Sequence, residues 1–323
     1  MTDESDAKPA AQVELDAQVK PGAQVKPAAK HKKSNVMIAI SAIAMIGALG
    51  LIAYPTFSDW WNRMHQSYAV AGYVEQTKDM SGAERKAMLK AAHEYNERLA
   101  ANGDRWHMTD AQKREYDETL DVTGTGIMGY VTIPRIKVKL PVYHGTSDGV
   151  LQIAAGHLAG TSLPVGGATT HAVVSGHTGL PSARLLTGLD ELKKGDTFAF
   201  HVLDQTYTYK VDQISVVLPS EISKLNIESG ADYATLITCT PYGVNSHRLL
   251  VRGHRIPNPK VPDKTQYDEP GEMTAVAAAV IGLLVFVAGC AFVGLARLWR
   301  RSWIVRHGLC AGAGAHHSSG VRG

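Results

Sequence analysis

Two long apolar runs interrupt an otherwise mixed pattern of polar and apolar residues. Residues 36–54 and 274–295 contain only apolar, small or uncharged side chains. About 20 such residues span a bilayer as a helix. A buried core helix of this length normally keeps a polar face, and neither run has one. We therefore predict transmembrane helices at residues 35–54 and 274–296.

Basic residues flank both runs on the sides that face the chain termini. His31, Lys32 and Lys33 precede the first run, and Arg297 and Arg300 follow the second. Positive residues stay on the cytoplasmic side, so we expect both ends inside the cell and the intervening chain outside. The first run could instead be a cleaved signal peptide. No good cleavage motif of small residues follows it, which favours a retained anchor.

The two ends of the chain are predicted to be cytoplasmic tails. In residues 1–34 the triplet Ala-Gln-Val recurs every six residues among Pro, Lys and Ala. Such a composition cannot bury a core, so we expect this tail to be disordered. Residues 297–323 form the second tail. A proline-rich linker at residues 258–273 leads into the second apolar run.

The pattern after the first run is helical, over residues 55–128. Ser81 and Glu84 have the spacing of a capping box, in which each side chain satisfies a backbone amide of the other residue. Apolar residues then recur at helical spacing, until Asn102 and Gly103 stop the helix. The residues of this face are Met88, Ala91, Ala92, Tyr95 and Leu99. A second cap at Thr109 predicts a short helix after it.

From Gly129 the pattern changes to short runs of β-branched and aromatic residues. Glycine and proline separate these runs, as they separate strands. The expected strands cover residues 130–133, 138–142, 197–202, 206–217, 235–238 and 249–252. Several short strands joined by longer loops predict a compact β-barrel over residues 129–257.

Composition narrows the chemistry of the exported segment. A formal net charge of +3 over 323 residues gives no basis for nucleic-acid binding. Of the three cysteines, Cys290 and Cys310 fall in or after the second apolar run, so Cys239 is alone outside. It is a reactive thiol, an intermolecular link or an inert buried thiol. The cysteines are scattered and no histidine pair has zinc-type spacing, so we predict no metal and no cofactor.

An apolar strand delivers Cys239 to the edge of a loop, and Arg248 begins the next predicted strand. If the two strands pair antiparallel, the two side chains lie close together across the loop. A guanidinium there favours the thiolate and can donate to an oxyanion. The thiol also needs a proton carrier. His177 follows a β-branched run and has a glycine on each side, which suits a tight loop that exposes the side chain. Local sequence alone does not select it over His157, His171 or His247.

Four stretches together resemble class C (pilin-polymerising) sortases. Residues 235–243 read TLITCTPYG, 245–253 read NSHRLLVRG, 156–164 read GHLAGTSLP and 175–181 read SGHTGLP. The resemblance implies a mainly β fold, an eight-stranded sortase β-barrel with N-terminal helices between two transmembrane helices. It also implies that Cys239 is the nucleophile, His177 the general acid/base and Arg248 the stabiliser of the transition state. His157 then has a structural role near the barrel.

The resemblance implies a cysteine transpeptidase on the outer face of a Gram-positive cell membrane. Its substrates would be pilin subunits with an LPxTG-like sorting signal, cleaved after Thr and joined to a pilin lysine. A thioester conserves the energy of the cleaved peptide bond, so an amine can take the acyl group without ATP. Three alternatives remain: a sortase with a peptidoglycan precursor as acceptor, a membrane-tethered thiol hydrolase, and a binding module in which Cys239 is structural.

Class C sortases usually carry a lid with an Asp-Pro-aromatic motif over the active site. Here residues 103–108 contain Asp104, Arg105 and Trp106, with arginine in place of the proline. By resemblance Asp104 would pair with Arg248, and Trp106 would cover Cys239. We expect a more mobile loop, because proline's fixed φ is absent. The alternative is a surface loop with a packed Trp.

Overall fold

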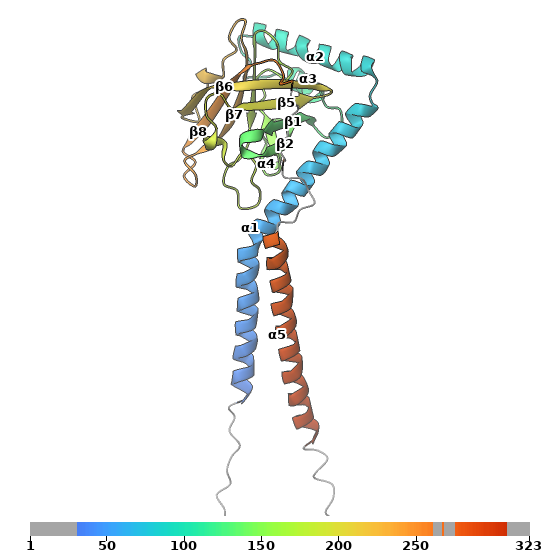
Figure 1. Cartoon of the computed structure of the whole chain (residues 1–323), viewed down its shortest axis with the longest axis vertical. Helices are drawn as coiled ribbons and strands as arrows, with labels where there is room; N and C mark the ends of the chain where they lie inside the picture. The colour runs from blue at the N-terminus through green and yellow to red at the C-terminus, as the bar shows by residue number, and fades with distance from the viewer. Residues whose placement is uncertain (1–30, 261–266, 268–274, 309–323) are drawn as a thin grey trace, which may run out of the picture. The chain divides into compact units, whose positions relative to one another are not determined.

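The computed structural model describes residues 31–260, 267 and 275–308 (Figure 1). Of these, residues 45–290 form one compact unit, and residues 31–44 and 291–308 belong to a second unit. The first helix, α1 (His31–Asp79), continues past the predicted end at residue 54 and through Pro55. It begins at His31, so the last four residues assigned to the N-terminal tail are helical. The rest of that tail and most of the predicted linker lie outside the described residues.

Within the described ranges, one helix is long and apolar enough to cross a membrane, the part of α1 at Ile40–Asp79. Its apolar side chains at Ile40, Ile43, Leu51 and Ile52 are exposed, as a lipid-facing helix requires. The last helix, α5 (Ala275–Gly308), runs beyond the predicted end at residue 296. Within the described residues, the apolar stretch found in it, Ile281–Gly294, is shorter than a membrane span, so the second predicted span is not confirmed.

The second half of α1 is bound to the barrel by its polar side chains. Tyr73 is 1% exposed; its hydroxyl donates to the carbonyl of Met128 at 3.2 Å and accepts from the amide of Leu203 at 2.7 Å. Gln66 donates to the carbonyl of Ile153 at 2.8 Å. A buried tyrosine hydroxyl normally finds such partners, and here they fix the helix against one barrel strand and against the turn at Leu203.

Two short helices follow, α2 (Gly82–Ala101) and α3 (Asp110–Glu118), next to one another against the barrel (Figure 1). Both predicted capping boxes are present. Of the predicted apolar face of α2, Ala92, Tyr95 and Leu99 are buried and Ala91 is exposed. Asn96 is also buried, because its amide group bonds to both the N–H and the carbonyl of Leu163.

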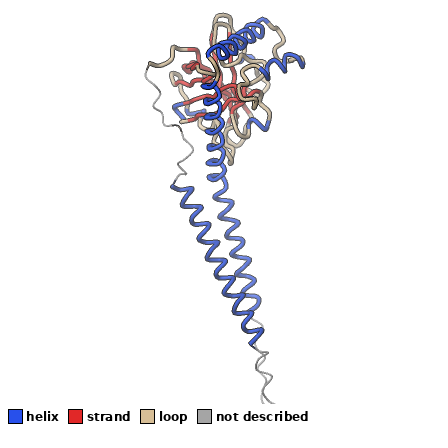
Figure 2. Tube along the Cα trace, turned by 90° about the vertical axis from the view of Figure 1, so that its right-hand side faces the viewer, coloured by secondary structure: helices blue, strands red, loops and turns tan. Residues whose placement is uncertain are grey.

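Eight strands form a closed barrel in the order β1-β2-β3-β4-β7-β8-β6-β5, and Figure 2 shows them gathered in one body. The predicted eight-stranded barrel is therefore confirmed. The strands are β1 (Ile127–Ile133), β2 (Val138–His144), β3 (Ala155–His157), β4 (Thr170–Ser175), β5 (Thr197–Val202), β6 (Gln205–Val217), β7 (Asp232–Thr240) and β8 (His247–Arg255). Short helical turns lie between them at Pro134–Ile136, Asp148–Leu151 (α4), Leu189–Glu191 and Ser223–Leu225.

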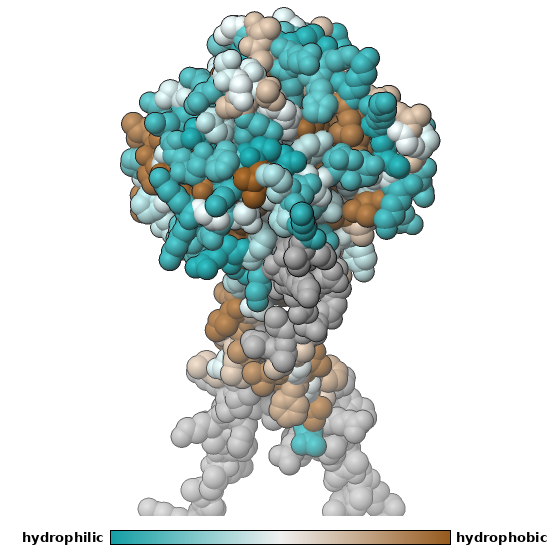
Figure 3. Space-filling model, turned by 45° about the horizontal axis from the view of Figure 1, so that its top comes forward, coloured by the Kyte–Doolittle hydropathy of each residue, from teal (hydrophilic) through white to brown (hydrophobic). Residues whose placement is uncertain are grey.

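The barrel has an apolar interior and, on the outside of β4, β7 and β8, a second small apolar cluster. The interior includes Phe198, Phe200 and Tyr209, whose rings contact one another. The outer cluster consists of Val173, Leu225, Ile237 and Leu250. Elsewhere the face seen in Figure 3 is mostly hydrophilic, with separate apolar patches. The strands that carry the outer cluster thus have apolar side chains on both faces.

Candidate active site

The pairing of β7 with β8 places Cys239 directly opposite Arg248. The two strands are antiparallel, and the loop between them leaves both residues at the same end of the barrel. Each side chain is partly exposed. The antiparallel pairing on which the prediction depends is confirmed, and it places the two residues opposite one another at the loop.

His177 reaches the same end of the barrel from a different part of the chain. It follows β4, which runs parallel to β7 with Ser175 opposite Ile237. Beyond the strands, the amide of Gly176 donates to the carbonyl of Ile237 at 3.0 Å, and the Thr238 hydroxyl donates to the carbonyl of Gly176 at 2.9 Å. These bonds hold the residue before His177 against the residues before Cys239.

Glycine is required at position 176, because a Cβ there would lie 2.8 Å from Cγ of the Leu186 side chain. Gly179 has φ +72°, in the region that favours glycine, and a Cβ there would lie 2.4 Å from the ring of Tyr242. The loop that carries His177 therefore packs closely on the β7–β8 loop. Gly179 allows this close approach, and Gly176 allows Leu186 of the same loop to pack on it.

Cys239, His177 and Arg248 line one cavity of about 420 Å³. Its walls are largely apolar and come from the outer cluster, from the β6–β7 loop and from Trp106. The apolar lining residues include Leu158, Val217, Ile222, Leu225, Ile237 and Leu250. The contribution of the β6–β7 loop was not predicted, since no local pattern marks it. The cavity suits an extended peptide with apolar side chains.

The guanidinium of Arg248 uses one of its nitrogen atoms to bind the backbone of its own loop. Its Nη1 donates to the carbonyls of Asn245 at 3.2 Å and His247 at 3.1 Å. Within the described residues these are its hydrogen bonds, so Nε and Nη2 remain available to donate into the cavity. Arg248 can thus be held by one nitrogen while the others bind a substrate oxygen.

The three competing histidines do not line this cavity. His157 is buried, and Nε2 donates to the carbonyl of Ser162 at 2.8 Å while Nδ1 lies 3.0 Å from the Tyr116 hydroxyl. Burial lowers its pKa to about 4, so the ring is neutral and holds the loop after β3. Burial also lowers the pKa of His171. His247 bonds with the neighbouring Ser246 hydroxyl at 2.9 Å.

His157 makes folding acid-sensitive. Because its folded pKa of about 4 lies below the ordinary 6.5, the unfolded chain binds the extra proton between these values. The contribution to the free energy of unfolding is therefore full above pH 6.5 and decreases by about 3 kcal/mol as pH falls to 4, about 2 kcal/mol of it between pH 7 and pH 5. Urea unfolding of the full chain in detergent at pH 7 and pH 5 should show this decrease.

His157→Gln is expected to be less stable than wild type at pH 7 but to lose less stability on acidification. Burial of His171 acts in the same direction, so some pH dependence remains in the variant. His107→Gln is the matched control, because His107 is exposed. Equal pH dependence in wild type and His157→Gln would contradict this account.

The segment at residues 103–108 lies at the cavity, but one of its predicted contacts is wrong. Asp104 does not pair with Arg248: its carboxylate pairs with His107 Nδ1 at 2.8 Å, and its side chain is 67% exposed. The carboxylate finds its partner three residues along the chain, in the same loop, instead of on β8. Trp106, by contrast, lines the cavity together with Cys239. Arg105, expected to loosen the loop, is itself buried.

No group of three or more His, Cys, Asp or Glu side chains suited to a metal occurs in the part of the chain that the structure describes. The reactive groups that line the cavity are a thiol, an imidazole and a guanidinium. A thiol with an acid/base group and a cation beside it is the arrangement of enzymes that transfer acyl groups through a thioester.

Comparison with known proteins agrees with this class. Residues 131–256 match the family model described as a sortase domain. Sortase C1 of Streptococcus agalactiae is 51% identical, over 60% of this chain and 100% of that chain, with a TM-score of 0.59. A sortase C structure from Streptococcus pneumoniae, described in terms of catalysis and pilin substrate specificity, is 45% identical over 61% and 100%, with a TM-score of 0.54.

A structure of Clostridium perfringens sortase C with the C-terminal cell wall sorting motif is 41% identical over 59% of this chain and 99% of that chain, with a TM-score of 0.53. Among curated proteins, Sortase A of Streptococcus agalactiae is 30% identical over 35% of this chain, which spans about half of that relative's length (47%). The chain belongs to the sortase family of cysteine transpeptidases, among its class C members.

Proposed function

We propose that this chain is a membrane-anchored cysteine transpeptidase that cleaves an LPxTG-like sorting signal after Thr and joins the acyl group to a pilin lysine. One observation carries the proposal: Cys239, His177 and Arg248 line a single cavity whose other walls are largely apolar. The apolar walls suit the Leu and Pro of the signal. The similarity to sortase C structures supports the same substrates.

We assign the first half of the reaction to the three side chains that line the cavity. The Cys239 thiolate attacks the carbonyl carbon of the signal's Thr, and Arg248 stabilises the resulting oxyanion. His177 gives a proton to the leaving amine of Gly. The C–N bond breaks, and a thioester to Cys239 remains.

In the second half, the lysine amine of the acceptor attacks the thioester. His177 takes the proton from this amine, and the Cys239 thiolate leaves. An isopeptide bond forms, and the enzyme returns to its starting state. Water competes at this step, so the rate with an amine compared with the rate of hydrolysis separates a transpeptidase from a thiol hydrolase.

We propose further that α1 and α5 both cross the membrane, with the barrel on the outer face. The length and exposed apolar side chains of α1 support its part in this arrangement. The basic residues outside both apolar runs support a cytoplasmic location of both chain ends. In this arrangement Cys239 lies where secreted pilin subunits arrive.

Mass spectrometry of the full chain in detergent, incubated with an LPxTG peptide, tests the proposal. We expect an acyl adduct on Cys239 that moves to the side-chain amine of an added lysine peptide. An adduct that moves only to a peptidoglycan-type amine would instead assign the chain to wall anchoring. Loss of the adduct to water at a rate unaffected by amines would indicate a hydrolase. If no adduct formed although ordinary alkylating reagents still labelled Cys239, the proposal would be contradicted.

A further inference from the structure

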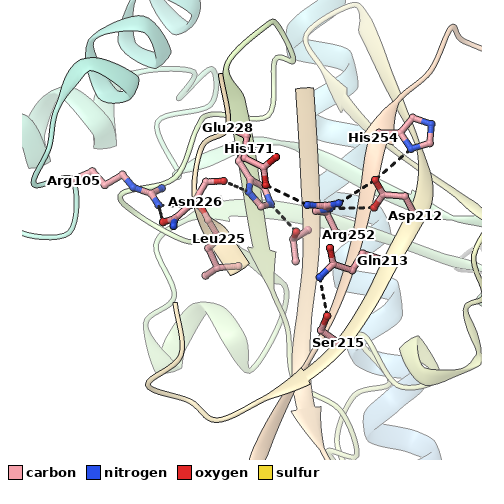
Figure 4. A network of polar contacts seen from close by, with 11 residues as sticks. Arg105, His171, Asp212, Gln213, Ser215, Leu225, Asn226, Glu228, Arg252 and His254 are labelled. Atoms are coloured by element: carbon pink, nitrogen blue, oxygen red, sulfur yellow. Dashed lines mark hydrogen bonds and ion pairs between the residues drawn. The ribbon is translucent and has the colours of Figure 1, made fainter. Parts of the chain in front are cut away.

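Arg105 is a buried cation held by uncharged oxygen atoms. Its side chain is mostly buried, with the residue 8% exposed. Nη1 donates to the carbonyl of Gly160 at 3.2 Å, and Nη2 donates at 3.1 Å to the carbonyl of Leu225 and to Oδ1 of Asn226. Figure 4 shows the guanidinium pointing toward Asn226. One side chain thus joins residues 103–108 to two separate loops of the barrel.

The first of these loops follows β3 and approaches the segment very closely. A Cβ on Gly160 would lie 2.6 Å from the carbonyl oxygen of Arg105 and 3.0 Å from Cε3 of Trp106. Gly160 also has φ +86°, which other residues rarely adopt. The guanidinium of Arg105 lies 4.5 Å from the centre of the Trp106 ring, in a cation–π contact. Arg105 and Gly160 therefore fix the indole that lines the cavity of Cys239.

The second loop, between β6 and β7, forms another part of the wall of the same cavity. Leu225 lines the cavity and packs in the outer cluster. The carbonyl of Asn226 accepts from His171 Nδ1 at 2.9 Å, and His171 Nε2 accepts from the Thr235 hydroxyl at 2.7 Å (Figure 4). This chain of bonds runs from Arg105 through Asn226 to β7, the strand that carries Cys239.

The energetics of burying Arg105 favour hydrogen bonds that can be broken. No carboxylate among the described residues pairs with Arg105, and its acceptors are neutral. Burial of a cation carries a desolvation cost that neutral acceptors offset only in part. Hydration of a released guanidinium would recover this desolvation cost, which offsets part of the loss of its hydrogen bonds.

We propose that Arg105 is a positioning residue that holds Trp106 over Cys239 and also fixes the part of the cavity wall that contains Leu225. Opening of residues 103–108 and movement of the β6–β7 loop are therefore coupled. The inference rests on the proposed function only in taking this cavity as the sorting-signal groove. A peptide that displaces the Leu225 wall weakens the bonds of Arg105, and release of Arg105 frees the wall. Such coupling is reciprocal by linkage.

The test is the rate at which a methanethiosulfonate reagent modifies Cys239 in the full chain in detergent, followed by mass spectrometry. Arg105→Ala is expected to raise this rate about 10-fold or more, because three hydrogen bonds and a ring contact are lost. Asn226→Ala, which never touches Cys239, is expected to raise it as well. Arg105→Lys should restore part of the wild-type protection, since an ammonium can reach one of the carbonyls. Asp104→Ala, the matched control, should leave the rate unchanged.

Hydrogen exchange in the same samples separates coupling from a local loosening. In Arg105→Ala, faster exchange is expected both at residues 104–108 and at residues 223–226, with β7 amides unchanged as evidence of an intact fold. Gly160→Ala is a second way to test the position of Trp106, because the added Cβ displaces the indole while Arg105 is kept. An unchanged labelling rate in Arg105→Ala or in Asn226→Ala would overturn the inference. Because labelling needs no peptide, this result is independent of whether an LPxTG adduct forms, which tests the proposed function.

Discussion

Replacement of Cys239 by alanine is expected to abolish both the acyl adduct and the transfer product, with a loss of at least about 10³-fold. Cys239 is the thiol that lines the cavity with His177 and Arg248. Without its sulfur no thioester can form, and the remaining groups can at most polarise a bound carbonyl. The measurement is mass spectrometry of the joined peptides after incubation of the full chain with an LPxTG peptide and a lysine acceptor.

Cys290→Ala is the matched control for this experiment. It removes the same atom from a cysteine in the apolar part of α5, and transfer should persist at the wild-type rate. Binding of the peptide should survive in Cys239→Ala, because the apolar walls are untouched. Product formation by Cys239→Ala would eliminate the thioester mechanism and leave Cys239 a structural residue.

The strands that the sequence predicts well are those with one buried face. Residues 197–202 and 206–217 alternate apolar and polar positions, and they form β5 and β6 almost to the residue. The two strands that were not predicted, β3 and β4, are buried on both faces. Such strands have no alternation to detect, and β3 is only three residues long. Only the family resemblance supplied the count of eight.

Part of the candidate site can be predicted from residues close together in the sequence, and part depends on residues far apart in it. Cys239 and Arg248 are joined by one short loop, so antiparallel pairing alone predicts that they meet. His177 is brought in by the parallel pairing of β4 with β7, a contact between residues about 60 positions apart, which no local pattern encodes. Choosing it over His157 required either the resemblance or the structure.

The segment at residues 103–108 shows where inference by resemblance fails. Loss of the motif's proline suggested a mobile loop, yet Arg105 replaces a fixed φ with hydrogen bonds to Gly160, Leu225 and Asn226. These acceptors lie 55 to 121 residues away in the sequence. The expected pairing of Asp104 with Arg248 fails for the opposite reason, because a nearby histidine satisfies the carboxylate first.

Arg248→Lys is expected to lose most of the transfer activity, about 10²-fold or more, the usual effect of removing an oxyanion donor. Arg248 binds two backbone carbonyls through Nη1 and keeps Nε and Nη2 for the cavity. A lysine has a single nitrogen on a flexible stem, so it cannot hold the loop and donate to an oxyanion in a fixed plane. The rate of adduct formation on Cys239, measured by mass spectrometry at saturating peptide, reports this step directly.

The matched control is Arg255→Lys, the same change on the same strand at a residue that binds Thr208 and Ile256 instead. It should acylate Cys239 at nearly the wild-type rate. If Arg248→Lys kept more than half of the wild-type rate, a point charge would suffice, and the role of Arg248 would be to favour the thiolate. If alkylation of Cys239 stayed unchanged while acylation fell, the loss would lie in the oxyanion, because alkylation depends on the thiolate and forms no tetrahedral intermediate.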